Sequence, residues 1–287
     1  MTTDSLIGDV SDTARWVAIY RAMESERPDA IFRDPYARRL AGAKGEAIVK
    51  GMARGRQMAW PMIVRTVLLD ELIMREISTG VDTVLNLAAG LDVRAYRMLQ
   101  LPEALHWIDV DHPHMVKYKA DAMVNETPVC RYESVPLDLA DVEGRQSLFA
   151  RVNARARRTL VITEGLLIYL KEGAVIALAE DLHAQSTFRR WASDLASPAL
   201  LRMMSRSWGK TVAAGNAPFQ FGPAEGPAFF AGFGWRELEY HALLDEGIRL
   251  NRSFPMARFW RWIGSLMPAK RRDQLKHFSG VLLLEQT

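Results

Sequence analysis

Apolar and polar positions alternate in blocks through the middle of the chain. Four short apolar runs have the length and composition of buried strands, at 83–88, 105–110, 129–135 and 159–163. The segments between them, 93–99, 115–123 and 142–156, have a helical or mixed pattern. Strands that alternate with helices in this way predict an α/β fold, with a parallel sheet and helices on both of its faces.

Two helices are predicted before this alternating region. Apolar side chains recur at helical spacing over 11–24, and the clearest amphipathic pattern of the chain covers 60–79 and stops at Gly80. Between them, Asp34 is expected to cap a turn that has Pro35 at the first helical position. Glycines recur through 42–56, which predicts a mobile or loosely packed segment.

Two charged residues, Arg65 and Asp70, interrupt the apolar pattern of the helix at 60–79. One interpretation places both side chains on the solvated face of that helix. The other points Arg65 toward a crevice that holds a cofactor. The pattern leaves both interpretations open.

The pattern changes after residue 195. An amphipathic helix at 173–187 and a fifth strand at 189–195 are followed by 196–230, which is rich in glycine, proline and aromatic residues. Such a stretch inside an α/β domain favours a lid or binding insertion, and the alternative is a packed surface insertion without ligand contacts. Two final strands, at 235–243 and 279–285, enclose an amphipathic helix at 259–267.

Composition excludes several classes of protein. The 287 residues are 49% hydrophobic and 25% charged, with a net charge of 37 − 34 = +3, which is too small to indicate nucleic-acid binding. Cys130 is the only cysteine, the start of the chain lacks a signal-peptide pattern, and no apolar run is long enough to span a membrane. The basic run 270–272 is interpreted as a solvated helix end. We therefore expect a cytoplasmic protein without nucleic-acid or membrane partners.

The first strand ends in a single glycine, Gly90, preceded by Ala88 and Ala89. The carboxyl ends of parallel strands are where ligands bind, and a glycine there lets the backbone approach a ligand closely. A dinucleotide fingerprint would need two further glycines. The turn therefore favours a cofactor without phosphates, such as S-adenosylmethionine, over a nicotinamide dinucleotide.

Acidic residues follow the second strand. An acid at this strand end is expected to accept hydrogen bonds from ribose hydroxyls, and Asp111 is favoured over Asp109 because Pro113 marks the loop just after it. His112 and His114 flank this proline without a second cluster of ligands, so no metal site is expected.

The third and fourth strands are each followed by one more acid. Asp138 and Leu139 are candidates to hold adenine, and the alternative is that Asp138 caps the next helix. Glu164, followed by Gly165, is expected in the crevice, where it would bind the cofactor ammonium or orient a substrate; the alternative is a structural tie to a neighbouring backbone.

In order and spacing, these stretches resemble the S-adenosylmethionine-dependent methyltransferases of the leucine carboxyl methyltransferase type. The bacterial branch of that family includes carboxyl O-methyltransferases of polyketide biosynthesis. The resemblance covers nearly the whole chain and is carried by Ala14 to Asp34-Pro35, Arg65-Thr66 with Asp70, the segments 89–97 and 109–113, Asp138-Leu139, and 164–170.

The resemblance implies a Rossmann-like sheet of seven strands with an antiparallel last strand, in one methyltransferase domain over 1–287. Its parts would be an N-terminal helical extension (1–80), a cofactor-binding core (81–195), a lid insertion (196–230) and C-terminal strands with a helix (231–287).

The resemblance also implies roles for single residues. Arg65 would hold the methionine carboxylate of the cofactor, Gly90 would let the methionine end approach, and Asp111 would bind ribose. Asp138 with Leu139 would frame adenine, and Glu164 would face the methionine amino group. The family usually has glycine at position 88 and glutamate at position 109, where this chain has alanine and aspartate.

The reaction expected from these features is methyl transfer to oxygen, most simply to a carboxylate of an apolar or aromatic small molecule. A carboxylate is ionised at neutral pH and needs no general base, whereas a phenol or alcohol does, and no histidine can be placed beside the methyl group. Tyr169 and Arg21 are candidate substrate contacts. A peptide C-terminus as acceptor, or a binding protein without activity, stays an alternative; the pattern does not predict the oligomeric state.

Overall fold

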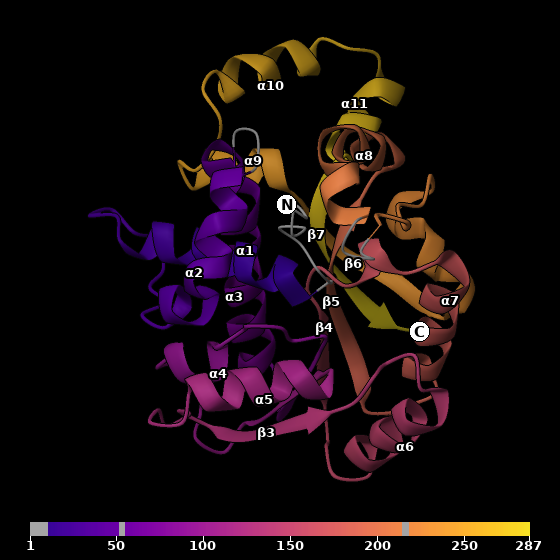
Figure 1. Ribbon diagram of the computed structural model, residues 1–287. Coiled ribbons are helices and arrows are strands. Elements are labelled where there is room, and N and C mark those ends of the chain that lie inside the picture. Colours follow the sequence, from indigo (N-terminus) through magenta and orange to yellow (C-terminus); the bar gives the residue numbers. More distant parts are fainter. Residues whose placement is uncertain (1–10, 52–54, 214–217) are drawn as a thin grey trace.

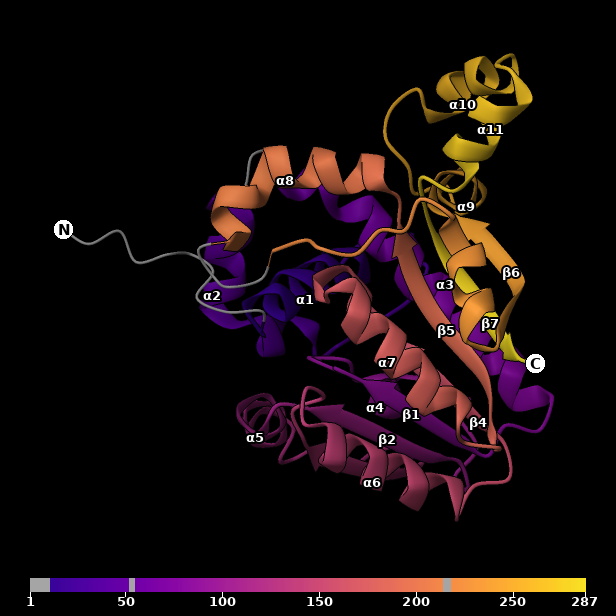
Figure 2. The same ribbon diagram turned by 90° about the vertical axis from the view of Figure 1, so that its right-hand side faces the viewer.

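The computed structural model describes residues 11–51, 55–213 and 218–287. They form a layered α/β structure in which helices cover both faces of one sheet (Figures 1 and 2). The strands are β1 (Thr83–Leu87), β2 (His106–Asp111), β3 (Arg131–Pro136), β4 (Thr159–Thr163), β5 (Phe188–Ala196), β6 (Trp235–Ala242) and β7 (Ser279–Gln286).

The strand order is β3-β2-β1-β4-β5-β7-β6. Strands β1 to β5 pair in parallel, and β7 lies antiparallel between β5 and β6. The predicted α/β fold with seven strands and an antiparallel last strand is therefore confirmed. The strand order reverses between β1 and β4, which is where open α/β sheets bind ligands.

Helices account for most of the remaining chain. The α-helices are α1 (Ser11–Ser25), α2 (Ala37–Gly51), α3 (Ala59–Ser78), α4 (Arg94–Arg97), α5 (Pro113–Ala122), α6 (Val142–Asn153), α7 (Glu172–His183), α8 (Pro198–Ala213), α9 (Leu243–Arg249), α10 (Ala257–Ser265) and α11 (Ala269–Lys276). Short 3-10 helices are η1 (Gly55–Met58), η2 (Leu167–Tyr169) and η3 (Gly226–Phe233). No helix among the described residues is long and apolar enough to cross a bilayer.

Alternate side chains of the strands enter different cores. On one face, Leu85 and Val161 pack with helices α6 and α7. On the other face, Val84 and Leu160 pack with α3. A third core joins α1, α2 and α5 at the N-terminal side of the domain. This arrangement buries every residue of β1 and β4, as expected for central parallel strands.

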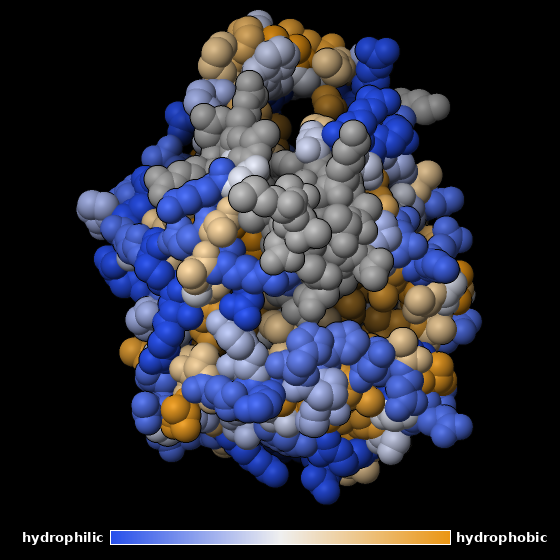
Figure 3. All heavy atoms as spheres, viewed as in Figure 1, coloured by the Kyte–Doolittle hydropathy of each residue, from blue (hydrophilic) through white to orange (hydrophobic). Residues whose placement is uncertain are grey.

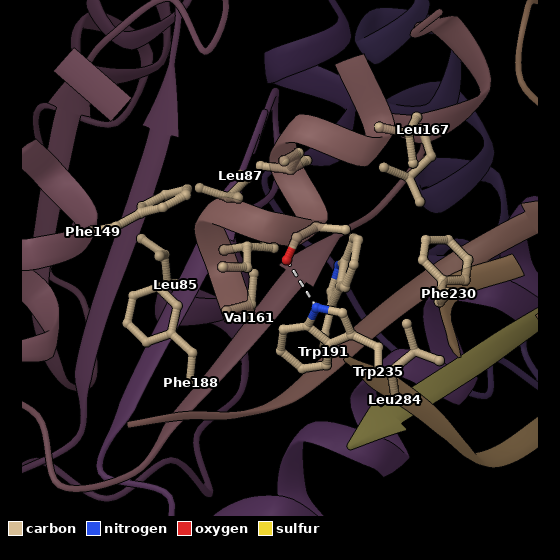
Figure 4. Close-up of a cluster of buried hydrophobic side chains, with 14 of the residues drawn as sticks. Leu85, Leu87, Phe149, Val161, Leu167, Phe188, Trp191, Phe230, Trp235 and Leu284 are labelled. Atoms are coloured by element: carbon tan, nitrogen blue, oxygen red, sulfur yellow. Dashed lines mark hydrogen bonds between the residues drawn. The ribbon is translucent and has the colours of Figure 1, made fainter. Parts of the chain in front are cut away.

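Two aromatic residues of the segment 196–230, which was predicted to form a lid, belong instead to the core beneath α6 and α7. Phe221 and Phe230 are buried, and the ring of Phe230 lies 5.2 Å from that of Trp191 (Figure 4). The indole nitrogen of Trp235 donates a hydrogen bond of 2.9 Å to the carbonyl of Ala179, which joins β6 to α7. For these two phenylalanines, the expectation of a ligand-facing lid is wrong, because they pack in the core with Trp191 and Trp235.

Two expectations for the N-terminal region are also wrong. The segment 42–51 is not loosely packed, because it lies in α2, where Ile48 and Val49 are buried; residues 52–54 lie outside the described part of the chain. Gly42 kinks this helix with a φ of 62°. Helix α2 begins at Ala37 rather than at Pro35, and Asp34 accepts a hydrogen bond from the Tyr36 amide in the turn before it.

Candidate active site

A cavity of about 840 Å³ lies at the carboxyl ends of β1, β4 and β5. Six of the eight residues singled out from the sequence line it: Arg21, Arg65, Gly90, Asp111, Glu164 and Tyr169. Helices α1 and α3 form one side of this cavity, and α8 to α11 contribute the far side. The cavity therefore joins segments far apart in the sequence at the point where the strand order reverses.

The Gly90 turn is held by the end of β2. The Gly90 amide donates a hydrogen bond of 2.6 Å to Asp111, whose other oxygen accepts from the His112 amide at 2.7 Å. Gly90 has a φ of +52°, and an added Cβ would lie 3.1 Å from the Cβ of Ala14. Both the backbone conformation and the limited space therefore favour glycine at this position. Ala88, where the family usually has glycine, also has a positive φ of 53°.

The two acids of β2 have different environments. Asp109 is buried and accepts hydrogen bonds from four side chains: Asn86, Trp107, Lys119 and Tyr132. Asp111 lines the cavity, and burial raises the pKa of its carboxyl group above the ordinary value. Asp109 is thus structural, while Asp111 is the acid of this strand that can face a ligand.

Arg65 points into the protein, so the interpretation of a solvated face is wrong for this residue. Its guanidinium is held by two carboxylates, with Nε 3.0 Å from Glu164 and Nη1 3.0 Å from Asp194. Asp194 also accepts a hydrogen bond of 2.5 Å from the Gly165 amide. Asp194 was not among the site residues predicted from the sequence. Its position near the carboxyl end of the predicted fifth strand would have been enough to predict it.

A second arginine continues this ionic network. Arg94 is buried and binds Glu164 at 2.8 Å, Asp92 at 2.6 Å and Asp70 of α3 at 2.6 Å. Asp70 also accepts a hydrogen bond from Arg97. Arg94 therefore ties the Gly90 turn to the N-terminal helix α3 and to the end of β4.

The network decides the charge states of its acids. Burial opposes ionisation of Glu164, but the guanidinium groups of Arg94 and Arg65 outweigh it and lower the pKa of this carboxyl group. Asp92 shows the same balance: burial acts against Arg94 and Lys119, and the net effect is a pKa well below the ordinary value. Both residues are thus carboxylates at neutral pH.

Asp138 and Leu139 are not among the residues that line the cavity. Asp138 is exposed and accepts a hydrogen bond from the Ala140 amide at 2.9 Å. The cap of α6 is Asp141, which accepts from the Gly144 amide, so the alternative of a cap at Asp138 is wrong. A role of this pair at adenine stays a prediction.

The two candidate substrate contacts differ in availability. Arg21 is engaged inside the protein, with Nε 2.8 Å from Asp34 and Nη2 2.6 Å from the carbonyl of Leu91, so it holds α1 against the Gly90 turn. Tyr169 follows β4 in η2, and its ring lies 5.7 Å from that of Phe219. Burial raises the pKa of Tyr169, so its hydroxyl keeps its proton at neutral pH.

The far side of the cavity is lined mostly by apolar side chains. They include Leu200, Met203 and Met204 of α8 and Trp260 and Ile263 of α10, and Arg261, Arg272 and Lys276 line this side as well. Helix α10 arches over the molecule in Figure 1, and Figure 3 shows hydrophobic residues along this arch with a hollow beneath it. No group of three or more His, Cys, Asp or Glu side chains that could hold a metal occurs within 11–51, 55–213 and 218–287.

The residues of the cofactor end fit S-adenosylmethionine. Two close-approach glycines, Gly90 and Gly165, line the cavity, each with a positive φ. Nη2 of Arg65 has no hydrogen-bond partner within the described residues, which leaves a donor for a carboxylate. The ionic network combines three arginines with four acids, 3 − 4 = −1, which suits a sulfonium cation better than a pyrophosphate.

Comparison with known proteins identifies the family of the chain. The sequence pattern of the leucine carboxyl methyltransferase family matches residues 14–183. A protein of Streptomyces coelicolor, provisionally named an S-adenosyl-L-methionine-dependent methyltransferase, is 35% identical over 84% of this chain and 87% of its own length. A Streptomyces avermitilis protein with the same provisional name is 34% identical over 91% and 95% of the two chains.

Solved structures show the same fold at low sequence identity. A DUF574 family protein of Streptomyces avermitilis superposes with a TM-score of 0.60 at 12% identity, over 96% of this chain and 97% of that one. A protein of Thermobifida fusca, provisionally described as a methyltransferase, superposes with a TM-score of 0.59 at 12% identity, over 99% and 97% of the two chains. The chain is thus a member of the leucine carboxyl methyltransferase family and an S-adenosylmethionine-dependent methyltransferase.

Proposed function

We propose that this methyltransferase acts on an oxygen, most simply the carboxylate of an apolar or aromatic small molecule. The observation that carries this proposal is the division of one cavity into a charged end at the β1 and β4 turns and an apolar end beneath α8 and α10. A substrate with an apolar body would fill the second end, and burial of that body would keep water from the reacting atoms.

Three acids at the charged end of the cavity are already engaged in ion pairs. Glu164, Asp194 and Asp92 each bind an arginine, so none of the three is a free base. A carboxylate acceptor needs no base, because it is already ionised at neutral pH. Bound S-adenosylmethionine would supply the methyl group, and Tyr169, which keeps its proton, would donate a hydrogen bond to the acceptor.

The protein's own contribution is binding and orientation. Arg65 would hold the methionine carboxylate, Glu164 would face the ammonium group, and Asp111 would accept from ribose hydroxyls. Gly90 and Gly165 would let the methionine end lie against the backbone. Each of these groups is held by a second residue, so the site exists before any ligand arrives.

Methyl transfer from labelled S-adenosylmethionine to a set of aromatic acids, phenols and amines with the same ring system tests this proposal. We expect the acids to be methylated, and the product to release methanol in alkali, since esters hydrolyse there and ethers do not. Alkali-stable products from the phenols, or methylation of a peptide carboxyl terminus alone, would overturn the proposed acceptor. Stabilisation by NAD and not by S-adenosylhomocysteine would overturn cofactor binding at this site.

A further inference from the structure

The segment that contains helices α10 and α11 has a larger net positive charge than the whole chain. The segment 256–276 contains six basic residues, Arg258, Arg261, Lys270, Arg271, Arg272 and Lys276, and one acid, Asp273, so its net charge is 6 − 1 = +5. The whole chain has a net charge of +3, which leaves 3 − 5 = −2 for all other residues. Because the remaining residues have a net negative charge, this excess of positive charge is local to the segment and indicates that the segment attracts an anion.

Three of these cations, Arg261, Arg272 and Lys276, line the cavity. The carboxylate that pairs with Arg261 belongs to Asp245, at 3.7 Å with both side chains more than half exposed. Arg272 donates only a long hydrogen bond of 3.4 Å to the carbonyl of Ser265. Within the described residues, no carboxylate forms an ion pair with Arg272 or Lys276. Unlike Arg65 and Arg94, Arg272 and Lys276 are therefore not neutralised by a carboxylate of the described residues, and Arg261 has only an exposed partner.

Apolar side chains line the cavity together with these cations. Met267 and Ile263 from the α10–α11 segment and Met203 from α8 line that part of the cavity. The ion-paired residues of the cofactor end have a net negative charge, which the sulfonium of a bound cofactor would offset, whereas the cations of the far end have no such partner and attract an anion. A ligand that fits both ends has an apolar body, an acceptor group beside the cofactor and a second, negative group directed toward α11.

We propose that Arg272 and Lys276, with Arg261, form a subsite for an anionic group of the substrate, remote from the methyl acceptor. The ligand class is an apolar molecule that carries a carboxylate, sulfate or phosphate at the end away from the transferred methyl group. The inference rests on the proposed function, because it takes this cavity to be the active site. It concerns only the end of the cavity that α8, α10 and α11 line. It predicts that charge, and not only apolar volume, selects the substrate.

Two fluorescent probes with related rings test the subsite: anilinonaphthalene sulfonate, which is an anion, and N-phenylnaphthylamine, which is neutral. We expect the wild-type protein to prefer the anion. The double variant Arg272→Gln/Lys276→Gln should bind the anionic probe about tenfold more weakly and the neutral probe unchanged, since about 1.4 kcal/mol corresponds to a factor of ten.

The matched control removes the same charge from the same two helices. Arg258 and Arg271 do not line the cavity, and Arg258→Gln/Arg271→Gln should leave the affinity for both probes unchanged. An equal loss of anion affinity in both double variants would overturn the subsite, because it would show a general field or binding on the outer surface. Equal affinity of the wild type for the two probes would overturn it as well.

Calorimetric titration with S-adenosylhomocysteine separates this inference from the proposed function. Intact cofactor binding in both double variants, together with no selective loss of the anionic probe, overturns the subsite alone. Failure of the wild type to bind S-adenosylhomocysteine overturns the proposed cofactor site and leaves the probe measurement standing.

Discussion

The two ends of the cavity are built on opposite principles. At the cofactor end, Arg65 and Arg94 are buried, and each binds two or more carboxylates within 3.0 Å. At the other end, where we propose that the substrate binds, Trp260 is 55% exposed and Lys276 has no ion pair among the described residues. A cofactor that a whole family shares can be bound by charged groups that other residues already hold in place. A substrate is bound instead by apolar surface and by charged groups that have no partner in the protein.

The largest effect is expected from removing Arg65. Arg65→Met leaves Asp194 without its cation and Glu164 with Arg94 alone, which should lower the free energy of unfolding by about 3–5 kcal/mol. Binding of S-adenosylhomocysteine should weaken about a hundredfold, because a charge-assisted contact to its carboxylate is lost. Urea unfolding and calorimetry measure the two effects.

Arg145→Met is the matched control for that variant. Arg145 is as buried as Arg65 and its Nε binds Asp181 at 2.8 Å, but it does not line the cavity. The Arg145→Met variant should therefore have a lower free energy of unfolding than the wild type and an unchanged cofactor affinity. If both variants lose affinity equally, the cofactor end is not at Arg65.

Removing the charge of Glu164 should have a smaller, pH-dependent effect. The arginines lower the pKa of Glu164 from its ordinary value of 4.5, so the stabilisation by the charged form is present above pH 4.5 and is lost as pH falls through the lowered pKa. Glu164→Gln should therefore cost about 3 kcal/mol at pH 7 and progressively less below pH 4.5. Urea unfolding across this range measures the difference, and a constant difference would contradict the ion pairs.

Gly90→Val should affect binding more than stability. A β-branched residue at a φ of +52° costs about 1–2 kcal/mol, and its Cβ meets Ala14. Cofactor affinity should be lost, because the turn can no longer lie against a ligand. Gly80→Val is the control: Gly80 also has a positive φ, of +102°, but open space surrounds it. Similar destabilisation with normal affinity is expected there.

Ala88→Gly tests strain in the same turn and should have a small effect of the opposite sign. Alanine at a φ of 53° is strained, so glycine should raise the stability by about 1 kcal/mol, measured as a higher unfolding midpoint. Asn251→Gly, at the same φ, should gain less, because asparagine tolerates this conformation. A loss of stability in Ala88→Gly would show that alanine is preferred for its contacts.

The smallest change in stability is expected at the substrate end. Trp260→Ala removes a large side chain that is mostly exposed, so the free energy of unfolding should change by no more than about 0.5 kcal/mol, and cofactor affinity should be unchanged. Thermal unfolding and calorimetry check both. A loss comparable to that of a core residue would mean that α10 packs firmly on the domain, and the contrast between the two ends would fail.

Local sequence patterns were sufficient to locate the strands. Each of the seven strands was predicted within two residues of its observed bounds, because central strands need continuous apolar runs and their ends need turn residues. The same patterns also showed which acids and glycines stand at strand ends, since the topology of an α/β sheet brings those ends together. Asp111 and Glu164 reached the cavity for this reason.

The partners of those groups depend on contacts between distant parts of the chain. The pairing of Arg65 with Asp194 joins residues 129 positions apart, and no local pattern encodes it. The same is true of Phe221 and Phe230, which lie in a glycine- and proline-rich segment that suited a lid but fill the core beside Trp191. It is also true of the segment 42–51, where Gly45 allows α2 to lie close to α1. Local patterns specify backbone and burial, whereas ion pairs and cavity walls depend on which distant segments the fold brings together.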